Sequence, residues 1–200
     1  MTMRHILIVY GTRYGQTARV AGRIRNTLTE RGHVVTVRQG DELTPDVRVG
    51  EFDGVLVGAS MIRHGYQPYI AAFAKRHAAA LNANPSAFFA VSGSAGSTNP
   101  LERAEARRLA EEFCKAAGWR PAIVEPVAGA IAYTKYNVLL RWVMKRISAK
   151  EGGSTDTTRD HEYTDWAQVD RFAMRFEEAV EAHAATGDAR GALAFSGNTA

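Results

Sequence analysis

The residues best suited to chemistry lie in a short polar loop near the amino terminus, Gly11 to Thr17 (GTRYGQT). The loop follows an apolar run and precedes a helical pattern, so its backbone N–H groups converge where a helix dipole is positive. Thr12 and Thr17 can add hydroxyl donors, and Gly15 lets the backbone approach a ligand closely. These features predict a phosphate cradle. The alternative is an ordinary strand-to-helix turn, because the spacing matches neither a Walker loop nor the GxGxxG fingerprint.

Two further polar loops follow predicted strands and are candidates for the same site. Residues 59–66 (ASMIRHGY) follow an apolar run at 53–59, and residues 92–97 (SGSAGS) follow one at 86–92. In a doubly wound sheet ligands bind at the carboxyl ends of the strands, so the three loops are expected to lie together. No Cys/His cluster indicates a metal, and no Ser/His/Asp set stands out.

An alternation of apolar patterns predicts the scaffold for these loops. Continuous apolar runs predict strands at 6–10, 34–37, 53–59, 86–92 and 122–127, and helical spacing predicts helices at 17–30, 69–81, 102–117 and 165–185. Asp165 can cap the last helix, with Gln168 placed to complete a capping box. The order of elements predicts an α/β fold: a doubly wound, five-stranded parallel sheet with helices on both faces.

Length and composition favour one globular domain. The chain has 200 residues, of which 46% are hydrophobic and 23% charged, as is usual for a domain of about 100–200 residues. We expect the domain to occupy 1–186, with an insertion at about 131–163 before the last helix, and 187–200 to form a flexible tail. Cys114 is the single cysteine, which excludes an intrachain disulfide. With no signal-like start and no apolar run of about 20 residues, the expected location is the cytoplasm.

Positive charge is concentrated in the insertion. The net charge is +4, yet residues 126–150 contain no acid and five bases: Lys135, Arg141, Lys145, Arg146 and Lys150. As a helix, this stretch would carry an apolar stripe, with Trp142 among the bases. Three interpretations stay open for 131–150. The segment could dock on an anionic membrane surface (the inner face of the cell membrane), pack on its own domain, or form a homodimer contact. The scarcity of exposed aromatic residues among the bases argues against nucleic-acid binding.

The first loop resembles the phosphate loop of the flavodoxin family, which has the form Ser/Thr-x-Ser/Thr-Gly-x-Ser/Thr. Thr12, Gly15 and Thr17 fit this form, whereas Tyr14 departs from it and has a phenol where the pattern has the short hydroxyl side chain that contacts the phosphate. The resemblance implies a flavodoxin-like fold that binds FMN, with the phosphate on the first loop and the isoalloxazine ring between the other two. The cofactor-binding residues that it implies are Thr12, Arg13, Tyr14, Gly15, Gln16, Thr17, Ala59, Ser60, Met61, Ile62, Ser92, Gly93, Ser94, Ala95 and Gly96.

A narrower resemblance runs from about the first strand to the last helix. Its pieces, in order, are TRxGQT at 12–17, GAS at 58–60, PSAF at 85–88, WRP at 119–121, AGA at 128–130, GGxTDT at 152–157 and YTDW at 163–166. Together they are similar to the menaquinone-dependent protoporphyrinogen IX dehydrogenase family, with departures at Gly65 and in 92–97. The resemblance implies an enzyme of haem biosynthesis that oxidises protoporphyrinogen IX to protoporphyrin IX with FMN and passes the electrons to menaquinone.

Arg63 and His64 are the candidates for catalytic roles within the second loop. Arg63 could attract a substrate propionate and His64 could handle protons, since histidine titrates near neutral pH; a solvated loop pair is the alternative. Two other functions stay open, a flavodoxin-type electron carrier and an NAD(P)H:quinone reductase. Carriers of that type are commonly acidic, whereas this chain has a pI near 9.4.

Other aromatic and histidine residues are expected to be structural. Trp119 is expected to anchor packing, and His77 to end a helix. Tyr66 could lie against the flavin or pack on the next helix. Surface or edge positions are expected for the remaining histidines outside the loops, His5, His33, His161 and His183.

Overall fold

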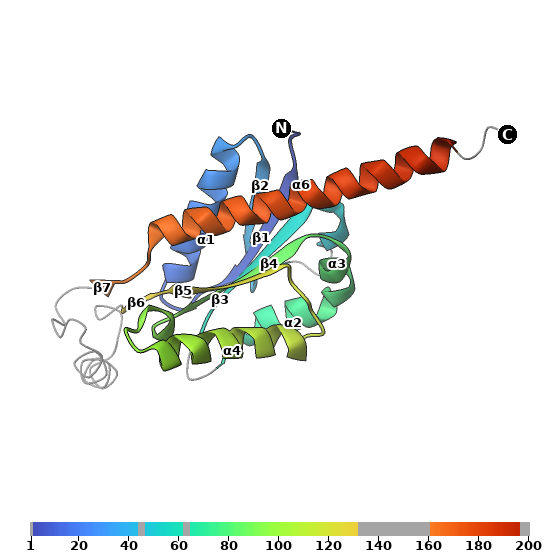
Figure 1. Ribbon diagram of the computed structural model, residues 1–200. Coiled ribbons are helices and arrows are strands. Elements are labelled where there is room, and N and C mark those ends of the chain that lie inside the picture. Colours follow the sequence, from blue (N-terminus) through green and yellow to red (C-terminus); the bar gives the residue numbers. More distant parts are fainter. Residues whose placement is uncertain (1, 44–46, 62–64, 132–160, 197–200) are drawn as a thin grey trace.

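A five-stranded parallel sheet forms the centre of the protein (Figure 1). The computed structural model describes residues 2–43, 47–61, 65–131 and 161–196. The sheet has the order β2-β1-β3-β4-β5, and every neighbouring pair is parallel. Its strands are β1 (His5–Gly11), β2 (Val34–Gln39), β3 (Gly54–Ser60), β4 (Ser86–Ser92) and β5 (Ile123–Ala128). This topology confirms the predicted doubly wound, flavodoxin-like fold.

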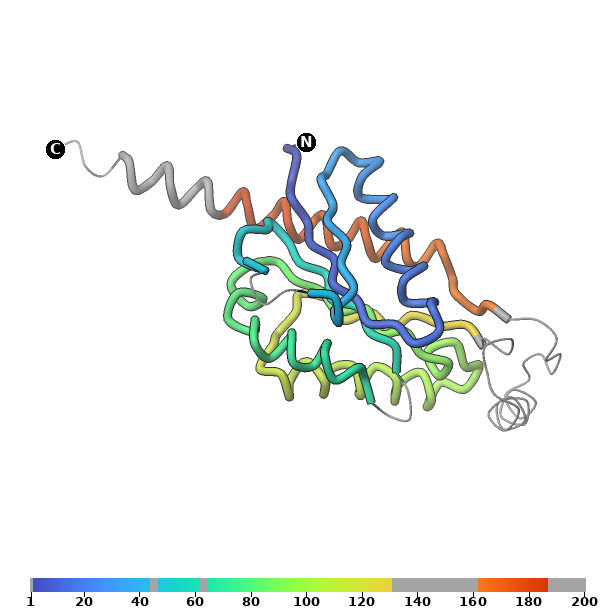
Figure 2. Tube along the Cα trace, turned by 180° about the vertical axis from the view of Figure 1, so that it is seen from behind, coloured from blue at the N-terminus to red at the C-terminus, as the bar shows by residue number. Residues whose placement is uncertain are grey.

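Helices cover both faces of the sheet, as predicted. On one face lie α1 (Gln16–Glu30) and α6 (Trp166–Ser196). On the other lie α2 (Pro68–Arg76), α3 (Ala78–Ala83) and α4 (Pro100–Ala116), as Figures 1 and 2 show from opposite sides. Because β1, β3 and β4 are covered on both faces, their sequences are continuous apolar runs rather than alternating ones.

The sheet divides the core into two apolar layers. Ile24 of α1 and Phe172 of α6 belong to the layer on the first face. On the other face Trp119 is 1% exposed and packs against Phe88, and its indole N–H donates to the Ser86 hydroxyl at 2.8 Å. Trp119 is therefore the packing anchor that the sequence predicts.

The helix predicted at 69–81 is two helices, with His77 between them. The His77 N–H donates to the carbonyl of Phe73 (3.0 Å), and its carbonyl accepts from the N–H of Leu81 (2.9 Å). The apolar residues keep their helical spacing across the break, so the sequence pattern could not reveal it. Burial, together with the charge of Arg76, lowers the pKa of His77.

The last helix is longer than predicted and is capped by a different set of bonds. The Asp165 carboxylate accepts the Gln168 N–H (3.1 Å), which confirms the cap. The Gln168 side chain instead donates to the Glu125 carboxylate (2.5 Å), so the capping box does not close. The helix continues past Ala185 to Ser196 because no proline stops it and alanine favours helix. Flexibility of 187–200 stays a prediction.

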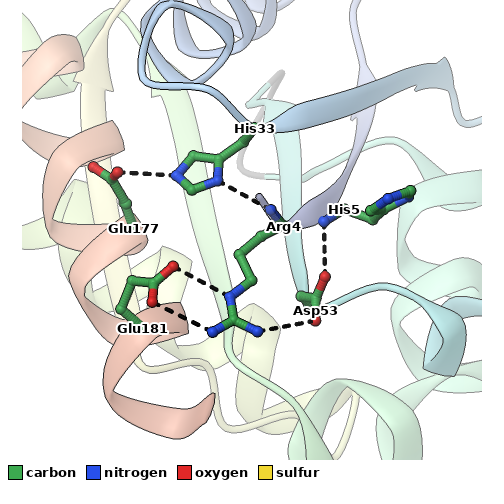
Figure 3. A network of polar contacts seen from close by, with 6 residues as sticks. All are labelled: Arg4, His5, His33, Asp53, Glu177 and Glu181. Atoms are coloured by element: carbon green, nitrogen blue, oxygen red, sulfur yellow. Dashed lines mark hydrogen bonds and ion pairs between the residues drawn. The ribbon is translucent and has the colours of Figure 1, made fainter. Parts of the chain in front are cut away.

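At the amino edge of the sheet, where the strands begin, His33 belongs to a buried polar network (Figure 3). A surface or edge position was predicted for it; His33 does lie next to the edge strand β2, but it is not at the surface. The His33 side chain is 1% exposed, and Nε2 lies 2.9 Å from a carboxylate oxygen of Glu177. The other Glu177 oxygen pairs with Arg31. Arg4, just before β1, pairs with Glu181 of α6 (3.2 Å). The sequence hides this burial because the partners are more than a hundred positions apart.

Candidate functional site

The first loop places a buried hydroxyl at the carboxyl edge of the sheet, where the strands end. Gly15 precedes α1 with φ +97°, a left-handed conformation that glycine adopts without strain. Its N–H donates to the Thr12 hydroxyl oxygen at 2.9 Å, which closes the turn. Thr17 is fully buried, and its hydroxyl has no hydrogen-bond partner among the described residues.

The amino end of α1 is open beside that hydroxyl. The first N–H groups of a helix have no partners within it, and the helix dipole makes this end positive. No side chain caps α1. A bound anion would satisfy both the backbone N–H groups and the Thr17 hydroxyl, so the residues present fit a phosphate group.

Tyr14 occupies the position where the flavodoxin pattern has a small hydroxyl residue. Its half-buried ring lies 5.8 Å from the exposed guanidinium of Arg13, a distance that allows a cation–π contact. The exposed guanidinium of Arg13 therefore adds positive charge at the surface of the first loop.

Gln67 holds the second loop closed at its base. The Gln67 amide accepts the Ser60 N–H (3.2 Å) and donates to the Ser60 hydroxyl (2.5 Å). The N–H of Met61 donates to the Val91 carbonyl of β4 (2.8 Å), so the loop leaves the sheet in a fixed direction. Sequence reasoning missed Gln67, and the one available signal was its place directly before Pro68, at the start of a helix.

Three predicted residues of the second loop, Ile62, Arg63 and His64, lie outside the described residues. Ala59 is the buried penultimate residue of β3, and Ser60 and Met61 are half-buried at the carboxyl edge. The structure therefore places the first residues of this loop, Ala59 to Met61, at the site.

The third loop turns tightly through η2 (Ser94–Gly96). The Ser92 hydroxyl lies 3.2 Å from the Ser94 hydroxyl and accepts the Ala95 N–H at 3.2 Å. Gly93 and Gly96 are exposed, while Ser92 is buried. The predicted residues Ser92 to Gly96 thus lie at the same carboxyl edge as the first two loops.

The insertion begins and ends beside the first loop. Its described ends are β6 (Ala130–Ile131) and β7 (His161–Glu162), which pair antiparallel and are here called the stem. Gln16 donates to Glu162 (2.6 Å) and to Thr164 (2.8 Å), and Arg19 forms an ion pair with Glu162 (2.8 Å). The stem is therefore tied to α1 at the candidate site, whereas the basic segment at 132–150 lies outside the described residues.

A groove of about 480 Å³ opens between the second and third loops and α4. Leu101 stands at its border and is 78% exposed. The groove is lined by Met61, Ser92 to Ser94, Leu101, Glu102, Glu105 and Leu109. Its volume is within the range of small-molecule sites, which is about 300–1,000 Å³.

Tyr66 packs in the core rather than facing the three loops. Its ring makes edge contacts with Phe88 (5.4 Å between ring centres) and Phe113 (4.8 Å). Burial raises the pKa of Tyr66, so its phenol stays protonated. Tyr66 therefore packs in the core as the structural alternative predicted, although its partners belong to β4 and α4 and not to the next helix along the chain.

Within the described ranges, no helix is long and apolar enough to cross a membrane. The same residues hold no group of three or more His, Cys, Asp and Glu side chains that could bind a metal ion.

The chain is similar to proteins of known class along most of its length. Residues 7–158 match the family described as flavodoxin domain. The chain is 36% identical over 177 residues to the protoporphyrinogen IX dehydrogenase [quinone] of Escherichia coli K12, covering 88% of this chain and 96% of that protein. It is 34% identical to the protein of the same name from Leishmania major, covering 85% of this chain and 73% of that protein.

Solved structures agree on the fold. Oxidised flavodoxin 1 from Bacillus cereus has a TM-score of 0.52 and 14% identity, covering 87% of this chain and 97% of that one. The sheet order and the open loop at its carboxyl edge define a flavodoxin-like protein. The chain belongs to the flavodoxin-domain family, and within it to the group of the protoporphyrinogen IX dehydrogenases. This membership confirms the family resemblance and the prediction of an enzyme, a flavin-dependent oxidoreductase.

Proposed function

We propose that this protein oxidises protoporphyrinogen IX to protoporphyrin IX with FMN, and passes the electrons to menaquinone in haem biosynthesis. One observation carries the proposal: the identity to the Escherichia coli protoporphyrinogen IX dehydrogenase [quinone] spans 96% of that protein. The same match covers 88% of this chain.

FMN, rather than a dinucleotide, fits the cradle of the first loop. The loop offers one anion site, formed by the open end of α1 and the buried Thr17 hydroxyl. The sequence has no second nucleotide fingerprint. Thr12 and Gly15 would shape the turn around the phosphate, and the second and third loops would flank the ring. When bound, the flavin supplies a reversible acceptor for the hydride that the porphyrinogen loses. Heat-released cofactor should therefore elute as FMN, and stoichiometric FAD would contradict the proposal.

Arg63 and His64 are proposed to act on the substrate rather than on the cofactor. The Arg63 guanidinium would pair with a propionate of the porphyrinogen, and His64 would accept a proton. Arg63→Gln should then raise KM for the porphyrinogen, and His64→Asn should lower kcat. Unchanged kinetics in both variants would contradict these roles and favour the alternative, in which Arg63 and His64 are solvated loop residues.

The decisive experiment compares electron donors under anaerobic conditions. Purified holoenzyme is mixed with protoporphyrinogen IX or with NADPH, and flavin bleaching is followed. Reduction by the porphyrinogen, followed by reoxidation with a menaquinone analogue and release of fluorescent protoporphyrin, supports the proposal. Reduction by NADPH alone would identify a quinone reductase. Reduction by flavodoxin reductases alone would identify an electron carrier.

The basic segment at 131–150 is proposed to bring the enzyme to an anionic membrane surface, where menaquinone resides. Its five bases and absent acids suit this role, and each base near an anionic surface contributes about 1 kcal/mol. The protein would then be cytoplasmic and peripheral at the inner face of the membrane. The stem ties the segment to the first loop, which supports a position beside the flavin.

Liposome sedimentation tests the membrane proposal. Binding should require anionic lipid and weaken at high salt. Replacing Arg141, Lys145 and Arg146 by Gln should weaken binding and slow menaquinone reduction, while reduction of a soluble quinone stays nearly intact. If the triple variant reduces both quinones at the wild-type rates, the segment instead packs on its own domain or on a second copy.

A further inference from the structure

We infer that Gln67 is a positioning residue, which makes the Ser60 hydroxyl a fixed hydrogen-bond donor toward the flavin ring. The inference rests on the proposed function and deepens it, because neither the fold nor the family resemblance gives Gln67 a role. Ser60 ends β3 and Gln67 stands directly before α2, so the two residues meet where the second loop leaves and rejoins the regular structure.

The backbone and the side chain of Gln67 are both held in place. Its carbonyl accepts the N–H groups of Ile70 (3.0 Å) and Ala71 (3.1 Å), which fixes the residue at the start of α2. Its side chain lies against Gly11, where β1 ends, because a β-carbon at Gly11 would come within 2.9 Å of the Gln67 amide oxygen. Since β1 and β3 are neighbours in the sheet, the amide is held beside the ends of both strands.

The contacts of this amide define the direction of each hydrogen bond. The backbone N–H of Ser60 can only donate, so the amide atom that it faces at 3.2 Å is the carbonyl oxygen of Gln67. The amide nitrogen is then the atom 2.5 Å from the Ser60 hydroxyl oxygen, and it can only donate. The hydroxyl oxygen therefore accepts from Gln67, and the proton of the hydroxyl is left for another acceptor.

The flavin ring is an acceptor that suits this proton. No other hydrogen bond of the Ser60 hydroxyl is found among the described residues, and Ser60 is half-buried at the carboxyl edge, where the second loop is proposed to flank the ring. The isoalloxazine ring has carbonyl oxygens and ring nitrogens that accept hydrogen bonds. Because the ring gains electron density on reduction, a donor stabilises reduced flavin more than oxidised flavin. The pair should therefore raise the midpoint potential, which favours uptake of a hydride from the porphyrinogen.

The test measures flavin binding and the midpoint potential, and it needs no porphyrinogen. Apoprotein is titrated with FMN, and the potential of the holoprotein is measured by anaerobic equilibration with a redox dye. Ser60→Ala removes the donor and keeps the backbone N–H that bonds to Gln67. The ratio of the dissociation constants for reduced and oxidised flavin should rise about tenfold, which lowers the potential by about 30 mV for a pair of electrons.

A second variant tests whether Gln67 acts through the hydroxyl. Gln67→Met keeps the length of the side chain over Gly11 and removes both hydrogen bonds to Ser60, so the hydroxyl is no longer directed and the potential should fall by a similar amount. In the Ser60→Ala background the same change should have almost no further effect on the potential. A purely structural role of Gln67 would instead give an equal shift in both backgrounds.

Asn82 supplies the matched control. Its amide also bridges backbone groups, because it donates to the Gly118 carbonyl (2.9 Å) and accepts the Arg120 N–H (2.8 Å). Asn82 lies in α3, just before β4 begins, and is therefore at the amino edge. Asn82→Leu should leave the potential and the flavin affinity at their wild-type values.

Three outcomes separate the inference from the proposed function. The inference fails if Ser60→Ala leaves the potential unchanged, or if Gln67→Met shifts the potential equally with and without the Ser60 hydroxyl. If Gln67→Met does not fold, Gln67→Asn, which keeps the amide but shortens its reach, takes its place in the same comparison. A wild type that dithionite reduces but the porphyrinogen does not would refute the proposed function instead.

Discussion

The buried polar groups at the two edges of the sheet differ in whether they have hydrogen-bond partners. At the amino edge, the buried side chains of His33 and Glu177 both have hydrogen-bond partners (Figure 3). At the carboxyl edge, the Thr17 hydroxyl is as deeply buried and has none among the described residues. A buried polar group without a partner destabilises the fold. At the amino edge the protein itself therefore supplies the hydrogen-bond partners of these buried groups. At the carboxyl edge a buried hydroxyl lacks a partner, as expected of a site that binds a ligand.

The hydrogen bonds of His33 define its tautomer. The backbone N–H of Arg4 can only donate, so His33 Nδ1, at 3.3 Å, accepts. The neutral ring then carries its proton on Nε2 and donates it to Glu177. Glu177 also pairs with Arg31, so its charge is compensated inside the core. Every one of these contacts stabilises the fold, and none faces the three loops.

The largest expected effect comes from breaking this network. Glu177→Ala leaves the buried His33 without its acceptor and removes the partner of the exposed Arg31, which should lower the free energy of unfolding by up to about 3 kcal/mol. Urea denaturation measures the change. Flavin affinity of the folded fraction should stay at the wild-type value. Glu178→Ala, at the exposed neighbouring position, should stay within about 0.5 kcal/mol of wild type. A loss of flavin affinity in Glu177→Ala would show that the two edges are not independent.

The second-largest effect is expected at the carboxyl edge, where a substitution should change flavin binding and not stability. Thr17→Ala removes a charge-assisted hydrogen bond worth about 1.5–3 kcal/mol, so the flavin dissociation constant should rise about tenfold or more. The apoprotein should be no less stable, because an unpartnered buried hydroxyl is removed with it. Titration calorimetry and apoprotein denaturation measure both quantities. Thr29→Ala, exposed on the same helix, is the control, and an unchanged dissociation constant for Thr17→Ala would place the phosphate elsewhere.

The difference between the edges also explains what the sequence could predict. The strands and most helices follow from apolar patterns within a few residues of each other, and the first loop follows from Gly15 and Thr17 at fixed spacing. The burial of His33 depends on Glu177, which lies 144 positions away. The closure of the second loop by Gln67 and the break at His77 depend on tertiary contacts that leave no periodic signal.

A matched pair of glycines at the two ends of α1 gives a smaller effect. Gly15 (φ +97°) precedes the helix and Gly32 (φ +92°) follows it. Gly32 closes the carboxyl end, where the N–H of His33 donates to the Leu28 carbonyl (3.2 Å). Alanine at either position should cost about 1–2 kcal/mol of stability. Only Gly15→Ala should also weaken flavin binding. Equal flavin affinity in the two variants would show that the shape of the first loop does not matter for the phosphate.

The smallest effects are expected from two partly exposed ion pairs, one at each edge. The first joins Arg4 to Glu181 at the amino edge. The hydrogen bond and charge of Arg4 lower the pKa of Glu181. A carboxylate with a lowered pKa contributes stability above its unfolded pKa, about 4.3 for glutamate, and loses it as the pH falls through the folded pKa. Glu181→Gln should therefore destabilise the protein at neutral pH by less than about 1 kcal/mol. In acid, below both pKa values, the variant and the wild type should have equal stability.

The corresponding pair at the carboxyl edge joins Arg19 to Glu162 of the stem (2.8 Å). Arg19 is 58% exposed in its side chain, so the pair is screened by salt and worth less than about 1 kcal/mol. Because Gln16 also donates to Glu162, Glu162→Gln loosens the first loop and should weaken flavin binding by less than about fivefold, at low salt only. Glu181→Gln should leave flavin binding unchanged at every salt concentration. If Glu162→Gln has no effect at low salt, the stem does not support the cradle, and the link between the insertion and the flavin is lost.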